Sequence, residues 1–452
     1  MTHQLSNWIA AGLCMALWLA LVVFTVCKTR KDAAAAANRV RSMGEITTDT
    51  VLVAYGSQTG FAEELAWSSA KLLSDNGVSS RPVAMSELNA EALLSTKRIL
   101  FVVSTTGEGD APDNASGFLR RLMTTELNLS GLSYGVLALG DRSYDQYCAF
   151  GRQLDDWLMR CGARGLFARI EVDNSDPLSI NCWQQELANI AGGAELTAWA
   201  PAAFAQWQLV RKTHMNPQSP GGEAWHLVFQ PVGHSPHWEA GDIAEFALPA
   251  IGETAPITRE YSLASIPADG AAEFCVRLMS TPDGRYGAGS GWLIRTLNIG
   301  DVVDMRIRPN RAFHPAPSDA PIILIGNGTG IAGLRAHIKT PRQGDAWLLF
   351  GERTQAHDNL FGEELKALQA TGQLQRVDHA WSRDEGDGRY VQHLIAENAR
   401  DLSRWIDRGA YIFVCGSLEG MSKGVHAALE TALGEELLQG LTDAGRYCRD
   451  VY

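Results

Sequence analysis

Two things are scarce in this chain of 452 residues: metal-binding cysteine pairs and positive charge. Its eight cysteines include no C-x-x-C pair and no other metal-ligand spacing, which favours reduced thiols in a cytosolic body over a metal site. The formal net charge of −12 argues against a nucleic-acid partner and suits a basic protein partner. The length allows two or three domains, each with its own core.

One long apolar run occurs near the N-terminus. Residues 8–27 carry no charge and are long enough to span a bilayer. The basic residues Lys28, Arg30 and Lys31 follow this run. A cleaved signal peptide, which is the alternative, has its basic residues in front of the apolar run. By the positive-inside rule we expect a transmembrane anchor within residues 1–28, a tether over 29–49, and a single-pass protein of the inner membrane. Its N-terminus would lie outside and all its domains in the cytoplasm.

The first folded segment begins with a strand–loop–helix pattern. Residues 50–55 read as a buried strand and residues 61–76 as a helix, with Gly56–Gly60 between them. Free backbone N–H groups converge at such a junction and make an anion site. Because the loop has no lysine to reach β/γ-phosphates, an ATP-binding P-loop is excluded. The hydroxyls of Ser57 and Thr59 suit a single terminal phosphate, such as that of FMN.

Two further apolar runs end in similar loops, Ser104–Gly109 and Leu139–Tyr144. Loops that follow successive parallel strands meet at one edge of an open α/β sheet, where ligands bind. Tyr144 and Tyr147 lie where a ring can stack on an isoalloxazine. For either tyrosine alone, an ordinary surface ring is the alternative. Three such loops together favour a flavin site.

The second half changes character twice. Residues 193–206 follow Gly192, are rich in alanine and contain Pro201, and they indicate a linker. Short strand-like runs with turn signals then predict an antiparallel barrel over residues 207–315. Over residues 316–452 the pattern becomes α/β, and a buried strand enters the glycine-rich loop Gly326–Gly330. Its glycines allow a pyrophosphate to approach the following helix N-terminus closely.

These motifs resemble the diflavin reductases, the family that contains cytochrome P450 reductase and the sulfite reductase flavoprotein subunit. The resemblance implies an α/β flavodoxin-like FMN domain over residues 50–192. It also implies a ferredoxin-reductase-like module, made of an antiparallel β-barrel FAD domain and an α/β NADP domain. The chain departs from the family at one place. Gly241-Asp242 reaches Arg259 with no room for the usual helical connecting domain, so how the two flavins are held close is open.

The resemblance assigns FMN to residues of the three loops. They are Ser57, Gln58, Thr59, Gly60, Phe61 and Ala62, then Ser104, Thr105, Thr106 and Gly107, then Leu139, Gly140, Asp141, Tyr144, Tyr147 and Cys148. Asp173 matches an acidic position near the flavin. Several relatives have an aromatic residue where Thr106 stands, so one flavin face is expected to lack an aromatic stack.

Other motifs resemble FAD and NADP sites. In the R-x-Y-[ST] motif the arginine pairs with the flavin pyrophosphate, the tyrosine packs on the ring and the serine bonds near N5. Here the motif is Arg259, Glu260, Tyr261 and Ser262, and the pyrophosphate turn is Gly287, Ala288, Gly289 and Ser290. The nicotinamide dinucleotide is assigned to Gly328, Thr329 and Gly330, and its adenosine phosphate to Ser382, Arg383, Arg389, Tyr390 and Gln392.

The last motifs concern hydride transfer. Phe413–Gly416 resembles a strand end that places a thiol beside the nicotinamide C4, and the chain ends nearly as the sulfite reductase flavoprotein does. In that family the terminal aromatic, here Tyr452, covers the FAD ring and moves aside for nicotinamide. The resemblance therefore implies Ser262, Cys415 and Asp450 as the catalytic group. An inert buried cysteine is the alternative for Cys415.

The expected function is that of a membrane-anchored, NADPH-dependent diflavin reductase with FMN, FAD and NADPH as cofactors and no metal. Electrons would pass from NADPH to FAD to FMN, and then to a one-electron acceptor protein that contains haem or iron. A ferric-siderophore or quinone reductase that acts directly is one alternative. A flavodoxin-type docking or regulatory module is another, although intact loops at both flavin sites speak against it.

Ser382 and Arg383 predict a preference for NADPH over NADH. A hydroxyl and a guanidinium suit the 2′-phosphate through charge-assisted hydrogen bonds. The family's usual lysine falls at Gly388, with Arg389 displaced by one position. We expect steady-state kcat/KM to be higher for NADPH, and equal or better use of NADH would contradict the assignment.

Overall fold

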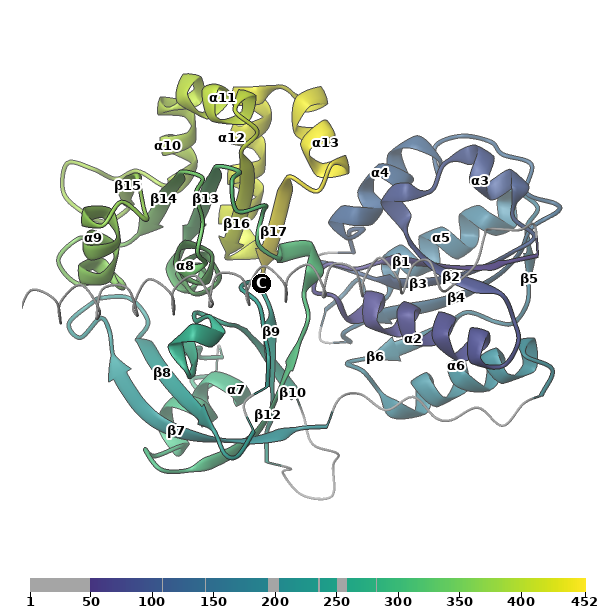
Figure 1. Ribbon diagram of the computed structural model, residues 1–452, viewed down its shortest axis with the longest axis horizontal. Coiled ribbons are helices and arrows are strands. Elements are labelled where there is room, and N and C mark those ends of the chain that lie inside the picture. Colours follow the sequence, from purple (N-terminus) through teal and green to yellow (C-terminus); the bar gives the residue numbers. More distant parts are fainter. Residues whose placement is uncertain are drawn as a thin grey trace, which may run out of the picture.

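The computed structural model describes residues 49–107, 109–142, 144–193, 203–234, 236–249, 258–281 and 283–452. Three sheets organise these residues, and they form three parts that meet around the C-terminus (Figure 1). We refer to them in chain order as the first, second and third parts.

The first part is a parallel sheet between two layers of helices. Its strands are β1 (Val51–Gly56), β2 (Ser80–Ala84), β3 (Arg98–Ser104), β4 (Ser133–Gly140), β5 (Arg164–Gly165) and β6 (Ile170–Asp173). Its helices are α2 (Phe61–Asp75), α3 (Ala90–Ser95), α4 (Asp113–Arg121), α5 (Ala149–Arg160) and α6 (Pro177–Ile190). Successive strand residues face opposite sides, so Leu52 and Ala54 pack with α4 and α5, and Val51 and Val53 with α2 and α6. The predicted flavodoxin-like α/β architecture is confirmed.

The second part is an antiparallel sheet in the order β10-β9-β12-β7-β8-β11. Its elements are β7 (Ala205–His214), β8 (Ala224–Pro231), β9 (Ile243–Ala247), β10 (Thr258–Ser262), β11 (Ala272–Arg277), α7 (Ala288–Gly291) and β12 (Val302–Arg308). Aromatic side chains, among them Trp207, Phe229, Phe246 and Phe274, fill its interior. Within the described residues no ladder joins the end strands β10 and β11, so closure into a barrel stays a prediction.

The third part is again a parallel sheet, in the order β15-β14-β13-β16-β17. Its strands are β13 (Ile322–Asn327), β14 (Ala346–Glu352), β15 (Arg376–Trp381), β16 (Tyr411–Gly416) and β17 (Tyr447–Val451). Its helices are α8 (Ile331–Lys339), α9 (Gly362–Ala370), α10 (Val391–Glu397), α11 (Ala399–Asp407), α12 (Lys423–Leu433) and α13 (Glu435–Asp443). The strand order reverses between β13 and β16, and open α/β sheets bind ligands at such a point.

The predicted inner-membrane location needs correction. Within the described ranges, no helix is both long and apolar enough to cross a bilayer. The longest helix there, α2, has 15 residues, whereas a span needs about 20. The predicted anchor, residues 1–28, lies outside the described residues, as do 29–48 of the tether and 194–202 of the linker.

The loop edge of the first part docks directly against the third part. The guanidinium of Arg449, on β17, pairs with both carboxylate oxygens of Asp113 at the start of α4, with 2.8 Å between Nε and Oδ2. Gln58 Nε2 donates to Asp113 Oδ2 at 3.0 Å and to the Arg449 carbonyl at 2.9 Å. Because Gln58 belongs to the first predicted FMN loop, this loop is itself part of the contact.

Two arginines of the second part bind the same loop edge of the first part. Arg308, at the end of β12, donates to the carbonyl oxygen of Thr59. Arg311 Nη1 lies 3.1 Å from Glu63 Oε1 in the first turn of α2. Direct docking therefore brings the predicted flavin loops to the other two sheets without a connecting domain.

The half-buried Arg449–Asp113 pair predicts a specific effect of Asp113→Asn. The variant leaves Arg449 without its anionic partner and should weaken docking by about 2 kcal/mol, so that small-angle scattering shows a larger radius of gyration. The control is Asp443→Asn, because the Arg121–Asp443 pair crosses the same interface but is more exposed. Equal scattering from both variants would contradict a leading role for Arg449.

Candidate functional site

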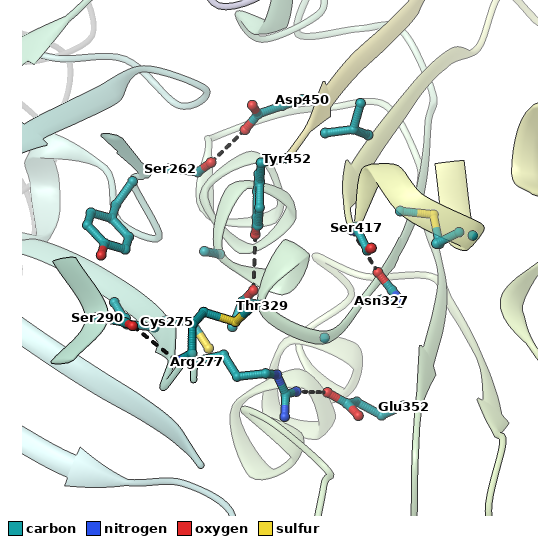
Figure 2. Close-up of a pocket in the computed structure, with 18 of the residues that line it drawn as sticks. Ser262, Cys275, Arg277, Ser290, Asn327, Thr329, Glu352, Ser417, Asp450 and Tyr452 are labelled. Atoms are coloured by element: carbon teal, nitrogen blue, oxygen red, sulfur yellow. Dashed lines mark hydrogen bonds and ion pairs between the residues drawn. The ribbon is translucent and has the colours of Figure 1, made fainter. Parts of the chain in front are cut away.

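A cavity of about 1170 Å³ opens where the three parts meet, and each part contributes to its wall. Figure 2 shows side chains that converge on it from β10, the dinucleotide loop and the C-terminus. The predicted site residues along the wall are Thr59, Arg259, Glu260, Tyr261, Ser262, Gly287, Ala288, Gly289, Ser290, Gly328, Thr329, Ser382, Arg383, Arg389, Tyr390, Gln392, Asp450 and Tyr452.

The three predicted hydride-transfer residues lie together. Ser262 Oγ donates to Asp450 Oδ2 at 2.6 Å, and Cys415 Sγ lies 3.7 Å from the same oxygen. Burial raises the pKa of Asp450 above its usual value, while the Ser262 hydroxyl opposes this by stabilising the carboxylate. Burial, and then the charge of Asp450, raise the pKa of Cys415 well above its usual value. At neutral pH the cysteine is therefore a protonated thiol.

Strand register explains this convergence. Cys415 of β16 and Asp450 of β17 are direct neighbours in the parallel ladder, and Ser262 is the last residue of β10 in the facing sheet. The dinucleotide loop packs tightly behind them, because a Cβ on Gly330 would lie 2.0 Å from the Cys415 carbonyl oxygen. Only glycine fits at that position.

Tyr452 lies across the predicted dinucleotide loop. Its hydroxyl donates to Thr329 Oγ1 at 3.2 Å, and 55% of the residue is exposed. Its backbone is held more firmly, since its N–H donates to Gly416 and its carbonyl accepts from Leu418. A ring that is exposed on a fixed backbone can turn away from the loop. Its role as a gate stays a prediction.

The predicted FAD residues come from β10 and the turn at α7. The Tyr261 ring packs edge-on against Phe246, with 5.7 Å between centroids. A Cβ on Gly289 would lie only 2.5 Å from the Tyr261 hydroxyl, so the turn must pass close to this ring. Ser290 Oγ accepts from the Met279 N–H at 3.0 Å. Glu260 is exposed, and its Oε1 accepts from the buried Arg308 at 2.7 Å.

The three FMN loops meet at one edge of the first sheet, as predicted. Ser57 Oγ accepts from the Gly60 N–H at 2.9 Å, and Gly60 has a left-handed φ of 86°. Thr105 joins the second and third loops, because its N–H donates to the Leu139 carbonyl and its Oγ1 accepts from the Phe150 N–H. The other members are Phe61 and Ala62 at the start of α2, Ser104 at the end of β3, Thr106 and Gly107 in the turn after it, and Gly140 and Asp141 at the end of β4.

In and just after the third loop, some side chains are exposed and others point into the protein. Tyr144 is 54% exposed, as a stacking ring has to be. Cys148 is buried, its thiol donates to the Ala138 carbonyl at 3.3 Å, and burial raises its pKa to about 11. Asp173 Oδ1 accepts from the Arg142 N–H at 3.0 Å and so holds the loop in shape. The Arg142 guanidinium lies 5.1 Å from the Tyr147 ring centroid.

The predicted adenosine-phosphate residues differ in how free their side chains are to bind a phosphate. Ser382 Oγ donates to the Glu352 carbonyl at 3.2 Å, and the Arg383 side chain is exposed. Arg389 is already occupied by two carboxylates, those of Asp387 and Glu397. The other two members are Tyr390, which is exposed before α10, and Gln392, which packs beside Gly424 in α12.

Sequence reasoning missed three charged residues in this wall: Arg277 at the end of β11, Glu352 at the end of β14, and Arg353 directly after it. The side chains of Arg277 and Glu352 form an ion pair (Figure 2). The signal for Glu352 was available, because an acidic residue after the second strand of a dinucleotide fold commonly faces the cofactor. Arg277 carries no such signal, since it belongs to a different sheet.

Comparisons with known proteins match both ends of this architecture. Residues 53–182 match the family described as flavodoxin, and residues 324–427 match the oxidoreductase NAD-binding domain. Among curated relatives is the sulfite reductase [NADPH] flavoprotein alpha-component of Vibrio cholerae, 27% identical over 88% of this chain and 87% of the relative. The protein of the same name in Vibrio parahaemolyticus is 27% identical over 93% of this chain and 88% of the relative. The one in Shewanella oneidensis is 26% identical over 89% of this chain and 90% of the relative. These matches support the assignment of the chain to the diflavin reductases that its motifs predict.

The comparison also bears on the architecture of this chain. The alignment with the Vibrio cholerae protein spans 537 residues, although the reductase has only 452. The relative therefore carries insertions that this reductase lacks. The direct antiparallel pairing of β9 with β10 agrees with a second part that has no connecting domain.

The Ser262–Asp450 hydrogen bond predicts a shift in pH dependence. Flavin reduction by NADPH should slow as pH falls and Asp450 becomes protonated, because the carboxylate offers the charge that favours hydride loss. Ser262→Ala removes a donor that stabilises the carboxylate, so its pKa rises and the acidic limb moves to higher pH. Stopped-flow rates across pH measure this.

The matched control is Ser290→Ala, because Ser290 lines the same cavity but bonds to the Met279 backbone. Its acidic limb should stay at the wild-type pH even if binding weakens. An unmoved limb in Ser262→Ala would contradict the assignment.

Proposed function

We propose that this diflavin reductase passes electrons from NADPH through FAD and FMN to a one-electron acceptor, a protein that contains haem or iron. It is an NADPH-dependent flavoprotein oxidoreductase, with FMN on the flavodoxin domain and FAD and NADPH on the other two parts. The observation that carries the proposal is the shared cavity. Thr59 of an FMN loop lines the same space as the FAD motif and the dinucleotide loop.

The residues present fit these cofactors. Ligand pockets commonly measure about 300–1,000 Å³, and this cavity of about 1170 Å³ is large enough for more than one bound group. Its wall leaves no room for a side chain at Gly289 in the predicted pyrophosphate turn, so the backbone itself lines the cavity there. Ser57, Thr59 and the backbone at the start of α2 supply neutral donors for an FMN phosphate.

Each residue of the hydride-transfer group has a distinct task. When bound, FAD accepts a hydride from NADPH and FMN releases electrons singly. The Ser262 hydroxyl donates its proton to the hydrogen bond with Asp450 and so stabilises the carboxylate. Asp450 places this negative charge next to the expected position of the nicotinamide. Cys415, kept protonated by burial, does not line the cavity but packs against Asp450 as a neutral thiol. Tyr452 covers the dinucleotide loop and excludes water from it until a nicotinamide takes its place.

The acceptor is expected at the third FMN loop. Acidic residues lie in or just after the FMN loops, namely Glu63, Glu64, Glu108, Asp110, Asp113, Asp141 and Asp145. Glu63 and Asp113 bind arginines of the docked parts, so they do not belong to an acceptor surface in this arrangement. Asp145, beside Tyr144, is exposed. Its charge suits the steering of a basic partner.

We expect purified protein to contain FMN and FAD in equal amounts and to reduce a basic haem protein such as cytochrome c. That rate should fall as ionic strength rises, whereas FAD reduction by NADPH should respond less. Asp145→Lys should lower the rate of cytochrome c reduction further. The matched control is Asp156→Lys, an equal charge change at an exposed position of α5. FAD without FMN, or equal responses of both variants, would contradict the proposal.

A further inference from the structure

One ion pair in the cavity wall belongs to none of the motifs described above. Arg277, the last residue of β11, pairs through Nη2 with Oε1 of Glu352, the last residue of β14 (Figure 2). Arg277 Nη1 also donates to the Gly222 carbonyl at 2.7 Å, which fixes the guanidinium. Both residues line the cavity, so the pair joins the second and third parts at its wall.

Glu352 lies in the middle of the predicted dinucleotide site. On one side, a Cβ on Gly328 of the dinucleotide loop would lie 3.5 Å from Glu352 Oε1. On the other side, the Glu352 carbonyl accepts from both the N–H and the hydroxyl of Ser382. Only 4% of the Glu352 side chain is exposed, so water screens its charge poorly.

A carboxylate at this position conflicts with a phosphate-rich ligand. Unpaired, it would repel the pyrophosphate of either nicotinamide dinucleotide, and it would repel NADPH more because of the additional 2′-phosphate. In dinucleotide folds an acidic residue after this strand typically accepts from the free ribose hydroxyl of NADH. Arg277 removes both effects, since its guanidinium neutralises the carboxylate and occupies one of its oxygens. The other oxygen accepts from the Arg353 N–H at 2.9 Å.

We propose that Arg277 is a specificity-determining positioning residue, which neutralises Glu352 and so allows this site to take the 2′-phosphorylated dinucleotide. The inference rests on the proposed NADPH-dependent function and deepens it. Ser382 and Arg383 supply attraction for the 2′-phosphate, and Arg277 cancels the repulsion beside them. The preference is then divided between two sheets.

The test is a double-mutant cycle on the full chain with bound flavins. Arg277→Ala, Glu352→Gln and the double variant are compared with wild type for kcat/KM with NADPH and with NADH, using ferricyanide as acceptor. Arg277→Ala should lower the NADPH/NADH ratio about tenfold, through KM for NADPH rather than kcat. Glu352→Gln should keep or raise the ratio. The double variant should return it to within about twofold of wild type, because no charge is left to neutralise.

Arg277→Lys serves as the conservative variant and should restore most of the ratio. A purely structural role predicts a different result, in which Arg277→Ala lowers thermal stability and FAD content and weakens NADPH and NADH use equally. That result, or a double variant as poor as Arg277→Ala, would overturn the inference.

The wild-type NADPH/NADH ratio tests the proposed function separately. A wild-type enzyme that uses NADH equally well contradicts the preference for NADPH. The inference about Arg277 is judged only on how the ratio changes among the variants.

Discussion

Neighbouring side chains on a β-strand point to opposite sides. On β17 this alternation lets one strand contact both other parts of the molecule. Arg449 points toward the first part and pairs with Asp113, while Asp450 points toward the second part and accepts from Ser262. One strand of the third sheet therefore contacts both other parts through consecutive residues. The C-terminus lies at their junction for this reason (Figure 1). A shift of this strand by one residue would exchange the two contacts and lose both.

Direct docking has an electrostatic basis. Arg308 is almost fully buried between the first and second parts, where it binds Glu245 at 2.9 Å, Glu260 at 2.7 Å and the Thr59 carbonyl. A buried guanidinium with several acceptors is costly to expose, and it accepts only partners that match its geometry. Such an interface selects one orientation of the flavodoxin domain. It thus positions the flavodoxin domain through side chains of the second part itself.

Two buried carboxylates in the same cavity have opposite surroundings. Burial raises the pKa of both Asp450 and Glu352. Asp450 has neutral partners, the Ser262 hydroxyl and the Cys415 thiol, so its negative charge remains available to the site. Glu352 is paired with a cation, so its charge is cancelled. Partners rather than residue type decide which carboxylate acts on a ligand.

The amino-acid sequence by itself determined the local structures of this protein. Strand–loop–helix junctions, the glycine-rich loop and the R-x-Y-S motif each lie within a few consecutive residues, so the two parallel sheets and about half of the cavity-lining residues could be predicted. At Cys148 a motif position does not tell where the side chain points: its thiol turns into the core, and its role toward FMN stays a prediction. Only the tertiary structure decided the pairs Arg449–Asp113 and Arg277–Glu352, whose partners are 336 and 75 positions apart. The physical reason is that an ion pair leaves no periodic pattern in the sequence, and it exists only once separate sheets have docked.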